Sequence, residues 1–211
     1  MTLLRTYKYR LYPTQIHQEK LDSILELCRE LYNCALQQRI EAWKKARKFI
    51  SYQEQANSLP EVKNFRPEYQ EIHSQVLQDV LRRLDKNFKS FFRRIKNGEG
   101  AGFPRFKGVG RYKSITYPQS GWEFGEKLKV SKIGEIRVKK HRPLPAKAVV
   151  KTLTIKKEID KWYAVVVFEL PIEAEKRAVG RAVGVDVGIA HFATFSDGSK
   201  IENPKYLAKM E

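Results

Sequence analysis

The chain has 211 residues and a formal net charge of +17, with 41 Lys and Arg against 24 Asp and Glu. Hydrophobic residues make up 42% of it, which is enough for a buried core and excludes wholesale disorder. The longest apolar run, Trp162–Phe168, is too short to span a bilayer, and the first residues lack the apolar stretch of a secretory signal. The two cysteines have no scaffold-forming pattern, so we expect a cytoplasmic protein with no membrane partner.

A strand, a long helix and a short helix are predicted first along the chain. Alternating polar and apolar residues indicate a strand over 5–12, and Thr14 is the expected N-cap of a helix after it. Apolar residues at helical spacing then predict one amphipathic helix over about 15–48. A capping box at 51–54 opens a short second helix, which we expect Pro60 to end.

A third helix is predicted from residue 68 or 72 to Asn97, with Gly98 as its C-cap. It combines an apolar stripe with a ladder of cations on another face. The stripe consists of Leu77, Leu81, Leu84, Phe88, Phe91 and Ile95, and the ladder of Arg82, Lys86, Lys89, Arg93 and Lys96. At 1.5 Å per residue the ladder follows about 20 Å of helix axis, so it can track a phosphate backbone. An ordinary solvated helix face is the alternative interpretation.

The glycine-rich loop 98–108 joins aromatic residues to cations. Phe103 and Phe106 either stack on bases or pack against the adjacent core, and the residues leave both alternatives open. Arg105 and Lys107 would hold phosphates beside them.

Short strands come after the loop and suggest a small β-barrel with basic outer faces. They are expected at 114–117, 128–130, 136–139, 149–157 and 162–170, the last two joined by a hairpin at 158–161. Beyond the ladder and the loop, nucleic-acid contacts are expected from Lys8, Arg10, Arg111, Lys113, Lys139 and Lys140.

The positive charge is concentrated in two segments, 82–113 and 127–161, each with a net charge of +9. A face that only solubilises the protein would mix both signs, and that remains the plain alternative. Concentrated cations are typical of contacts with a polyanion, most often nucleic acid. No lipidation signal accompanies the charge, so an anionic membrane is the weaker hypothesis.

The segment Val183–Ile189 predicts a strand that places the Asp186 carboxylate between two glycines. A carboxylate buried without a partner is costly, so Asp186 should face water, a cation or a metal such as hydrated Mg²⁺. An exposed aspartate on an edge strand is the alternative. We expect a second strand over 191–195 and a tight turn at 197–198. The few acids downstream make a complete two-metal cluster hard to build.

Five segments, in this order, resemble those of the TnpB (OrfB) family of transposon-encoded proteins, which are RNA-guided DNA endonucleases related to type V CRISPR effectors. The segments are Tyr7–Thr14, Leu84–Phe92, Gly102–Lys107, Lys161–Tyr163 and Gly184–Gly188. The chain is similar to the front half of that family.

The resemblance implies an α+β fold in which a helical recognition lobe, 14–99, is inserted into a small wedge-like β-barrel formed by 1–13 and 100–178. Residues 179–211 would then be the first strands of an incomplete RNase H/RuvC-like domain. The family implies a guide RNA from the transposon end and target DNA as partners, with no small-molecule substrate. Asp186 would be the first catalytic, metal-binding carboxylate, and Mg²⁺ the cofactor of a complete nuclease.

The departures from the family pattern concern its catalytic and zinc-binding residues. The later Glu, the second catalytic Asp and the Cys-x-x-Cys zinc ribbon have no counterpart, so we expect no zinc site and no DNA cleavage by this chain alone. Two alternatives remain open. One is a non-catalytic DNA- or RNA-binding regulator of a transposon, and the other is a small Mg²⁺-dependent nuclease completed by dimerisation.

Overall fold

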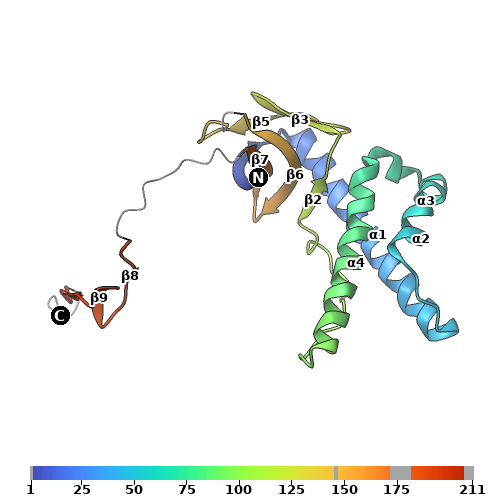
Figure 1. Ribbon diagram of the computed structural model, residues 1–211. Helices are drawn as coiled ribbons and strands as arrows, with labels where there is room; N and C mark the ends of the chain where they lie inside the picture. Colours follow the sequence, from blue (N-terminus) through green and yellow to red (C-terminus); the bar gives the residue numbers. More distant parts are fainter. Residues whose placement is uncertain (1, 145–146, 172–181, 207–211) are drawn as a thin grey trace. The chain divides into compact units, whose positions relative to one another are not determined.

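The computed structural model describes residues 2–144, 147–171 and 182–206, which fall into two compact units, 1–172 and 173–211. Within these described residues, the first unit holds four α-helices and a seven-stranded antiparallel sheet, and the second holds a three-stranded sheet (Figure 1). None of the described helices combines the length and the apolar character that crossing a membrane requires.

Helix α1 (Gln15–Ala46) confirms the long amphipathic helix. The Thr14 hydroxyl accepts from the backbone N–H of His17, and the His17 ring accepts from the backbone N–H of Thr14, at 3.4 Å each. These bonds satisfy donors that a first helical turn leaves without partners. Arg47 ends the helix at a φ of 53°, in the left-handed region. The buried face of the helix includes Leu21, Cys28, Leu31 and Leu36.

Three short helices come next: α2 (Tyr52–Asn57), α3 (Leu59–Phe65) and the 3₁₀ helix η1 (Pro67–Glu71). The predicted capping box is confirmed, because Ser51 accepts from the backbone N–H of Glu54 and the Glu54 carboxylate accepts from that of Ser51. The expectation that Pro60 ends the second helix is wrong. Pro60 lies in the first turn of α3, where the missing N–H would have no intrahelical acceptor and the fixed φ suits the helix.

Helix α4 (Ser74–Lys96) begins later than predicted, after His73, whose ring accepts from the backbone N–H of Gln75 at 3.4 Å. Its C-cap is Asn97 rather than Gly98, which comes next with a φ of +70° that glycine adopts readily. The apolar stripe is buried as far as Phe88, but Ile95 is 51% exposed. The stripe therefore extends beyond the core that the other helices cover.

The large sheet has the strand order β2-β6-β7-β1-β5-β4-β3. Its strands are β1 (Thr2–Tyr12), β2 (Ser114–Tyr117), β3 (Trp122–Phe124), β4 (Lys127–Val130), β5 (Gly134–Lys139), β6 (Val149–Glu158) and β7 (Lys161–Pro171). The predicted strands and the β6–β7 hairpin are confirmed, with ends shifted by up to three residues. The three-residue strand β3 was not predicted, because it is too short to show an alternating pattern.

The expected closed β-barrel is wrong. Strands β2 and β3 are the two edges of the sheet, and no pairing joins them in the described part of the chain. The sheet still curls, because the Phe124 ring on β3 lies 5.1 Å from the Tyr9 ring on β1 and 6.5 Å from the Phe168 ring on β7. These rings, together with buried Trp162, fill the concave side.

The edge strand β2 is covered by α4, which removes the need for closure. Arg83 of α4 donates to the Asp79 carboxylate at 2.7 Å, to the carbonyl of Ser114 at 2.9 Å and to the hydroxyl of Thr116 at 2.6 Å. On the neighbouring strand β6, the Lys157 ammonium donates to Asp22 of α1 at 2.6 Å. Helices and sheet of the first unit are therefore joined by charged hydrogen bonds as well as by apolar packing.

The second unit is a small sheet of β8 (Val185–Asp186), β9 (His191–Phe195) and β10 (Lys200–Glu202) in the order β10-β9-β8. The strand predicted at 183–189 shrinks to β8, and the residues from 182 to 190 are exposed. The strand at 191–195 is confirmed, as is the turn, where the Gly198 N–H donates to the carbonyl of Phe195 at 3.0 Å.

Candidate nucleic-acid interface

The outer face of the large sheet carries cations and tyrosines in direct cross-strand register. Lys139 of β5, Arg10 of β1, Tyr163 of β7 and Lys156 of β6 are successive partners in one row. At ~4.8 Å between strands, this row spans about 14 Å. The neighbouring row pairs Tyr12 with Arg137. We call this face the sheet platform, made of Lys8, Arg10, Tyr12, Arg137, Lys139, Lys156 and Tyr163.

Cations flank both rings of the sheet platform. The Lys8 ammonium lies 4.1 Å from the centroid of the Tyr163 ring, and the Arg10 guanidinium carbon lies 5.3 Å from it. Arg10 and Arg137 lie 5.6 and 5.9 Å from the centroid of the Tyr12 ring. Aromatic rings beside cations are the combination that holds single-stranded nucleic acids, since bases stack on the rings and phosphates pair with the cations.

One carboxylate partly neutralises the sheet platform. Glu158 pairs with Lys8 at 2.6 Å and with Lys156 at 2.9 Å, and the hydrogen bond from Lys8, followed by that from Lys156, lowers the pKa of Glu158. Arg10 and Lys139 have no carboxylate partner among the described residues. The β5–β1 end of the row is therefore its most electropositive part.

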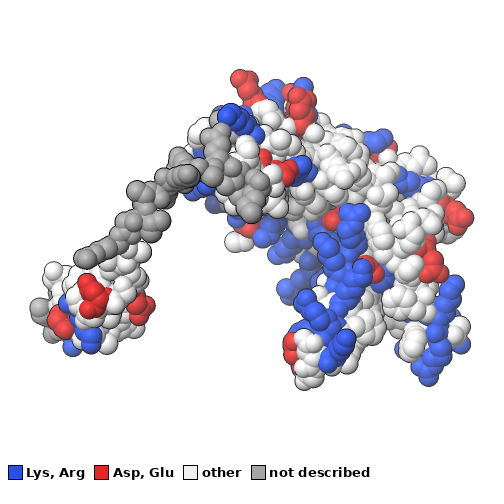
Figure 2. Space-filling view, viewed as in Figure 1, with Lys and Arg blue, Asp and Glu red and all other residues white. Residues whose placement is uncertain are grey.

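The cation ladder of α4 forms a second basic surface, and Figure 2 shows Lys and Arg side chains gathered along this helix. Arg82 donates to the Tyr52 hydroxyl at 3.4 Å, and Lys89 pairs with Asp85 at 2.9 Å. The other three members are exposed and have no ion-pair partner in the part of the chain that the structure describes; these are Lys86, Arg93 and Lys96.

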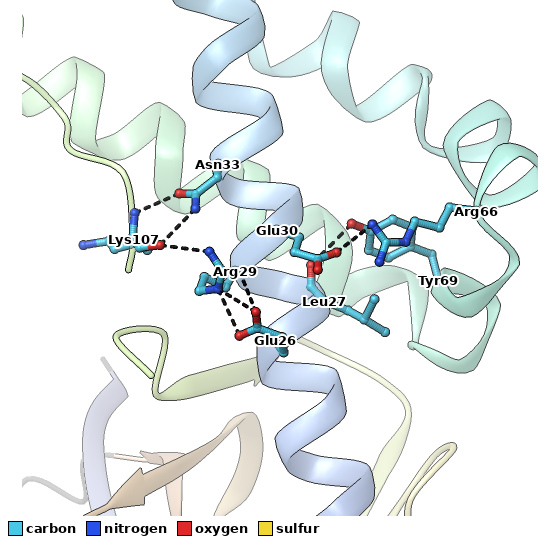
Figure 3. Close-up of polar contacts among 8 residues, drawn as sticks. All are labelled: Glu26, Leu27, Arg29, Glu30, Asn33, Arg66, Tyr69 and Lys107. Atoms are coloured by element: carbon cyan, nitrogen blue, oxygen red, sulfur yellow. Dashed lines mark hydrogen bonds and ion pairs between the residues drawn. The ribbon is translucent and has the colours of Figure 1, made fainter. Parts of the chain in front are cut away.

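The loop that carries Lys107 is fastened to α1 (Figure 3). The Asn33 side chain accepts from the backbone N–H of Lys107 at 2.8 Å and donates to its carbonyl at 2.9 Å. Arg29 donates to the same carbonyl at 3.1 Å, and Glu26 holds the Arg29 guanidinium. The Lys107 ammonium lies 5.7 Å from the Tyr32 ring centroid. Sequence reasoning missed Asn33 and Arg29, since no local pattern signals a contact across more than seventy residues.

The two phenylalanines of the loop behave differently. The Phe103 ring lies edge-on to Phe88 at 5.5 Å and to Phe91 at 5.3 Å, so it packs against α4. Phe106 is 52% exposed and makes no ring contact among the described residues. Arg105 beside it is exposed. The structure thus gives Phe103 a packing role and leaves Phe106 available for stacking.

The remaining predicted cations lie outside these clusters. Lys113 lines a cleft of about 380 Å³ together with Asp22 and Lys157, and the Lys140 ammonium lies 5.6 Å from the Phe124 ring centroid. Arg111 is exposed in the turn before β2. Sequence reasoning missed Tyr12, Arg137, Lys156 and Tyr163 as contacts, although the alternation of β1, β5, β6 and β7 assigns them to outer faces.

Asp186, the predicted metal-binding carboxylate, is exposed on β8 and pairs with Thr194 of β9. Within the described ranges, no group of three or more His, Cys, Asp or Glu side chains could hold a metal ion. A two-metal nuclease centre requires several converging carboxylates. The described residues around Asp186 therefore do not fit a Mg²⁺ site of that kind.

Comparison with known proteins gives matches along the whole chain. Residues 1–48 match the helix-turn-helix domain of the OrfB/IS605 family, although in this structure they form β1 and the single continuous helix α1. InsQ of Escherichia coli K12, described as a candidate RNA-guided DNA endonuclease, is 30% identical over 100% of this chain and 54% of its own length. A protein of Streptomyces pristinaespiralis with the same description is 32% identical over 96% of this chain and 50% of its own.

The chain therefore spans about half the length of the curated relatives that it matches. Among solved structures, the complex of Cas12f1 with sgRNA and target DNA aligns with 99% of this chain and 59% of that chain, at 13% identity and a TM-score of 0.41. That structural likeness is too weak to argue from.

Proposed function

We propose, from the premise that the chain belongs to the TnpB/OrfB family, that it is the nucleic-acid-binding portion of an RNA-guided DNA endonuclease and holds guide RNA and target DNA. The observation that carries this proposal is the sheet platform, where Arg10 and Lys8 flank the half-buried Tyr163 ring on the outer face of the sheet. Like charges gathered around a flat ring favour a polyanion with stackable bases over a neutral or cationic partner.

In this proposal, the ladder of α4 follows a phosphate backbone and the sheet platform takes unpaired bases with their phosphates. The loop that Asn33 fastens to α1 follows α4 in the sequence, and it adds Lys107, Arg105 and Phe106 to these contacts. The helices of 14–99 would correspond to the recognition lobe, and the curled sheet to the wedge-like element. Residues 179–211 would be the opening strands of the RuvC-like domain.

We further propose that this chain alone does not cleave DNA. Asp186 is the one predicted catalytic carboxylate, and the described residues around it do not supply the additional ligands that paired Mg²⁺ ions need. In a complete nuclease, Mg²⁺ would supply charge stabilisation for phosphodiester cleavage. The test is incubation of the chain with its RNA, a matching DNA duplex and Mg²⁺. Cleavage that Asp186→Ala abolishes would contradict this part of the proposal.

The binding proposal is tested by purifying the chain from its host, sequencing the RNA that co-purifies and measuring affinity for that RNA at several salt concentrations. With about six to eight phosphates neutralised, affinity should fall by about 10³-fold or more between 50 and 200 mM salt. The double variant Arg10→Glu/Lys139→Glu should weaken binding, whereas Lys20→Glu, on an exposed cation outside both surfaces, should have a much smaller effect. No bound RNA and a flat salt response would contradict the proposal.

A further inference from the structure

An aromatic groove of about 570 Å³ lies between the C-terminal parts of α1 and α4, and we call it the α1–α4 groove. Its lining includes Trp43 from α1, Phe49 from the segment after it, Phe88 and Phe92 from α4, and Phe103 from the loop. Trp43, Phe49 and Phe92 are each at least half exposed. A contiguous apolar surface of this kind on a soluble unit marks a binding site, and the volume lies in the usual range of ligand pockets, about 300–1,000 Å³.

A buried guanidinium with an unused donor also lines the α1–α4 groove. The Arg39 side chain is 4% exposed; its Nε donates to Gln55 at 2.9 Å and its Nη1 to Asp85 at 3.4 Å. Its Nη2 is buried and has no hydrogen-bond partner within the described residues, and the guanidinium carbon lies 5.2 Å from the Phe88 ring centroid. A ligand that brings an acceptor atom to Nη2 would remove the unfavourable free energy of leaving that donor unpaired.

The rim of the α1–α4 groove is positive. Lys44 and Lys48 line it, and the Arg47 guanidinium lies 5.6 Å from the Trp43 ring centroid. The nearby carboxylates already have partners, since Asp85 pairs with Arg39 and Lys89, and Glu54 pairs with Lys48. A second copy of this chain would bring the same cations together, so charge disfavours self-association through this groove.

The three properties together describe one class of ligand, which is flat and apolar on its faces, carries acceptor atoms on its edge and has a negative charge attached. We infer that the α1–α4 groove binds one unpaired nucleotide of an RNA or DNA strand, with the base among the aromatic rings, an acceptor of its edge at Arg39 and its phosphate at Lys44 and Lys48. This inference rests on the proposed function, and it adds a base-binding site separate from the sheet platform.

The test compares the full chain with the double variant Trp43→Ala/Phe92→Ala. The probes are single-stranded RNA and DNA oligonucleotides containing 2-aminopurine, and a fully paired duplex of the same sequence. Losing a stacking partner should weaken single-strand binding by about tenfold to a hundredfold and leave duplex binding unchanged. The slope of log affinity against log salt should stay at the parent value, because stacking releases no counterions. The parent chain should quench 2-aminopurine and the variant should not.

Two controls make the outcome decisive. Trp43→Phe keeps an aromatic ring and should retain most of the affinity, while Phe65→Ala, on a 92% exposed side chain of α3 outside the groove, should change nothing. Comparing the loss of affinity for the RNA oligonucleotide with the loss for the DNA oligonucleotide identifies which kind of strand the groove binds. Two outcomes would overturn the inference while leaving the proposed function intact. In one, the double variant binds the single strand as tightly as the parent chain does. In the other, light scattering shows that the double variant has lost a dimer but not its affinity. Salt-independent binding by the parent chain would overturn the proposed function itself.

Discussion

Arg10 and Tyr163 face each other across β1 and β7, with the guanidinium carbon 5.3 Å from the ring centroid and one guanidinium nitrogen 3.5 Å from the hydroxyl. The Lys8 ammonium lies 4.1 Å from the same ring. The ring quadrupole attracts both cations, so one tyrosine holds two positive charges close together on the outer face of the sheet. Such an arrangement raises the local positive potential beside the Tyr163 ring, which is also a flat surface on which a base can stack.

Tyr163 therefore provides the first prediction. Tyr163→Ala should weaken binding of a single-stranded oligonucleotide by about tenfold, because it removes both the stacking surface and the group that orients Arg10 and Lys8. Tyr163→Phe keeps the ring and should stay within about threefold of the parent chain. Fluorescence anisotropy at one fixed salt concentration measures both. Equal losses in the two variants would mean that the hydroxyl, not the ring, matters here.

The ladder of α4 gives a prediction with a different readout. The triple variant Lys86→Ala/Arg93→Ala/Lys96→Ala removes the members that have no ion-pair partner within the described residues. The slope of log affinity against log salt should become shallower by about 2 to 3, since each phosphate contact contributes about 0.7 to 0.9. Lys20→Ala is the control and should leave the slope unchanged. An unaltered slope in the triple variant would show that this face of α4 does not contact phosphates.

Sequence patterns predicted the elements of the fold better than their assembly. The alternation in β1 and β7 and the helical spacing of α1 and α4 depend on neighbouring residues, so the sequence carries them locally. Pro60 was misinterpreted because proline is compatible with both the end of one helix and the first turn of the next. Whether the sheet closes into a barrel depends on how α4 covers the edge strand β2 through Arg83. No local sequence pattern contains that contact.

The candidate site shows the same division. The cations of the ladder follow one another at helical spacing within 82–96, so the sequence pattern alone predicts that they share one face of a helix. The sheet platform joins residues from 8 to 163, and it exists because the order of the strands places β1 between β5 and β7. Two further features likewise depend on tertiary contacts among the described residues. These are the hydrogen bonds between Asn33 and the backbone of Lys107, and the unpaired Nη2 of Arg39.

Asn33 provides a test of how the loop is positioned. Asn33→Ala removes the side chain that pairs with both backbone groups of Lys107, so amide hydrogens across 102–107 should exchange with solvent at least about tenfold faster. Nucleic-acid affinity should fall by a few-fold, because the loop cations lose their fixed position. Gln37→Ala, on an exposed residue of the same helix, is the control for effects of mutating α1. Unchanged exchange in Asn33→Ala would show that other contacts hold the loop.

The two cysteines should differ in reactivity. Burial raises the pKa of the Cys28 thiol to about 12, while Cys34 is exposed. At pH 8 almost no Cys28 is thiolate, so iodoacetamide should label Cys34 alone in the native chain and both cysteines in denaturant. Because the unfolded thiol loses its proton first, from about its ordinary pKa of 9.0, Cys28 should lower the stability of the folded state as pH rises above that value. Mass spectrometry after alkylation checks the first expectation; rapid native labelling of Cys28 would show that the core around it opens.

Arg83 and Arg82 are adjacent on α4 and should have opposite roles. Arg83 joins α4 to the edge strand β2 through Asp79, Ser114 and Thr116, so Arg83→Ala should lower the free energy of unfolding by about 2–3 kcal/mol, the range for charged hydrogen bonds that leave partners unsatisfied.

Arg82→Ala loses one long hydrogen bond to Tyr52, so it should change stability by less than about 1 kcal/mol. Urea unfolding followed by circular dichroism measures both variants, and nucleic-acid affinity at a urea-free reference condition separates the roles. The expected pattern is a large stability loss in Arg83→Ala and an affinity loss in Arg82→Ala. The reverse pattern would place Arg83, rather than the ladder, on the binding surface. It would also show that the contact between α4 and β2 contributes little to the assembly of helices and sheet.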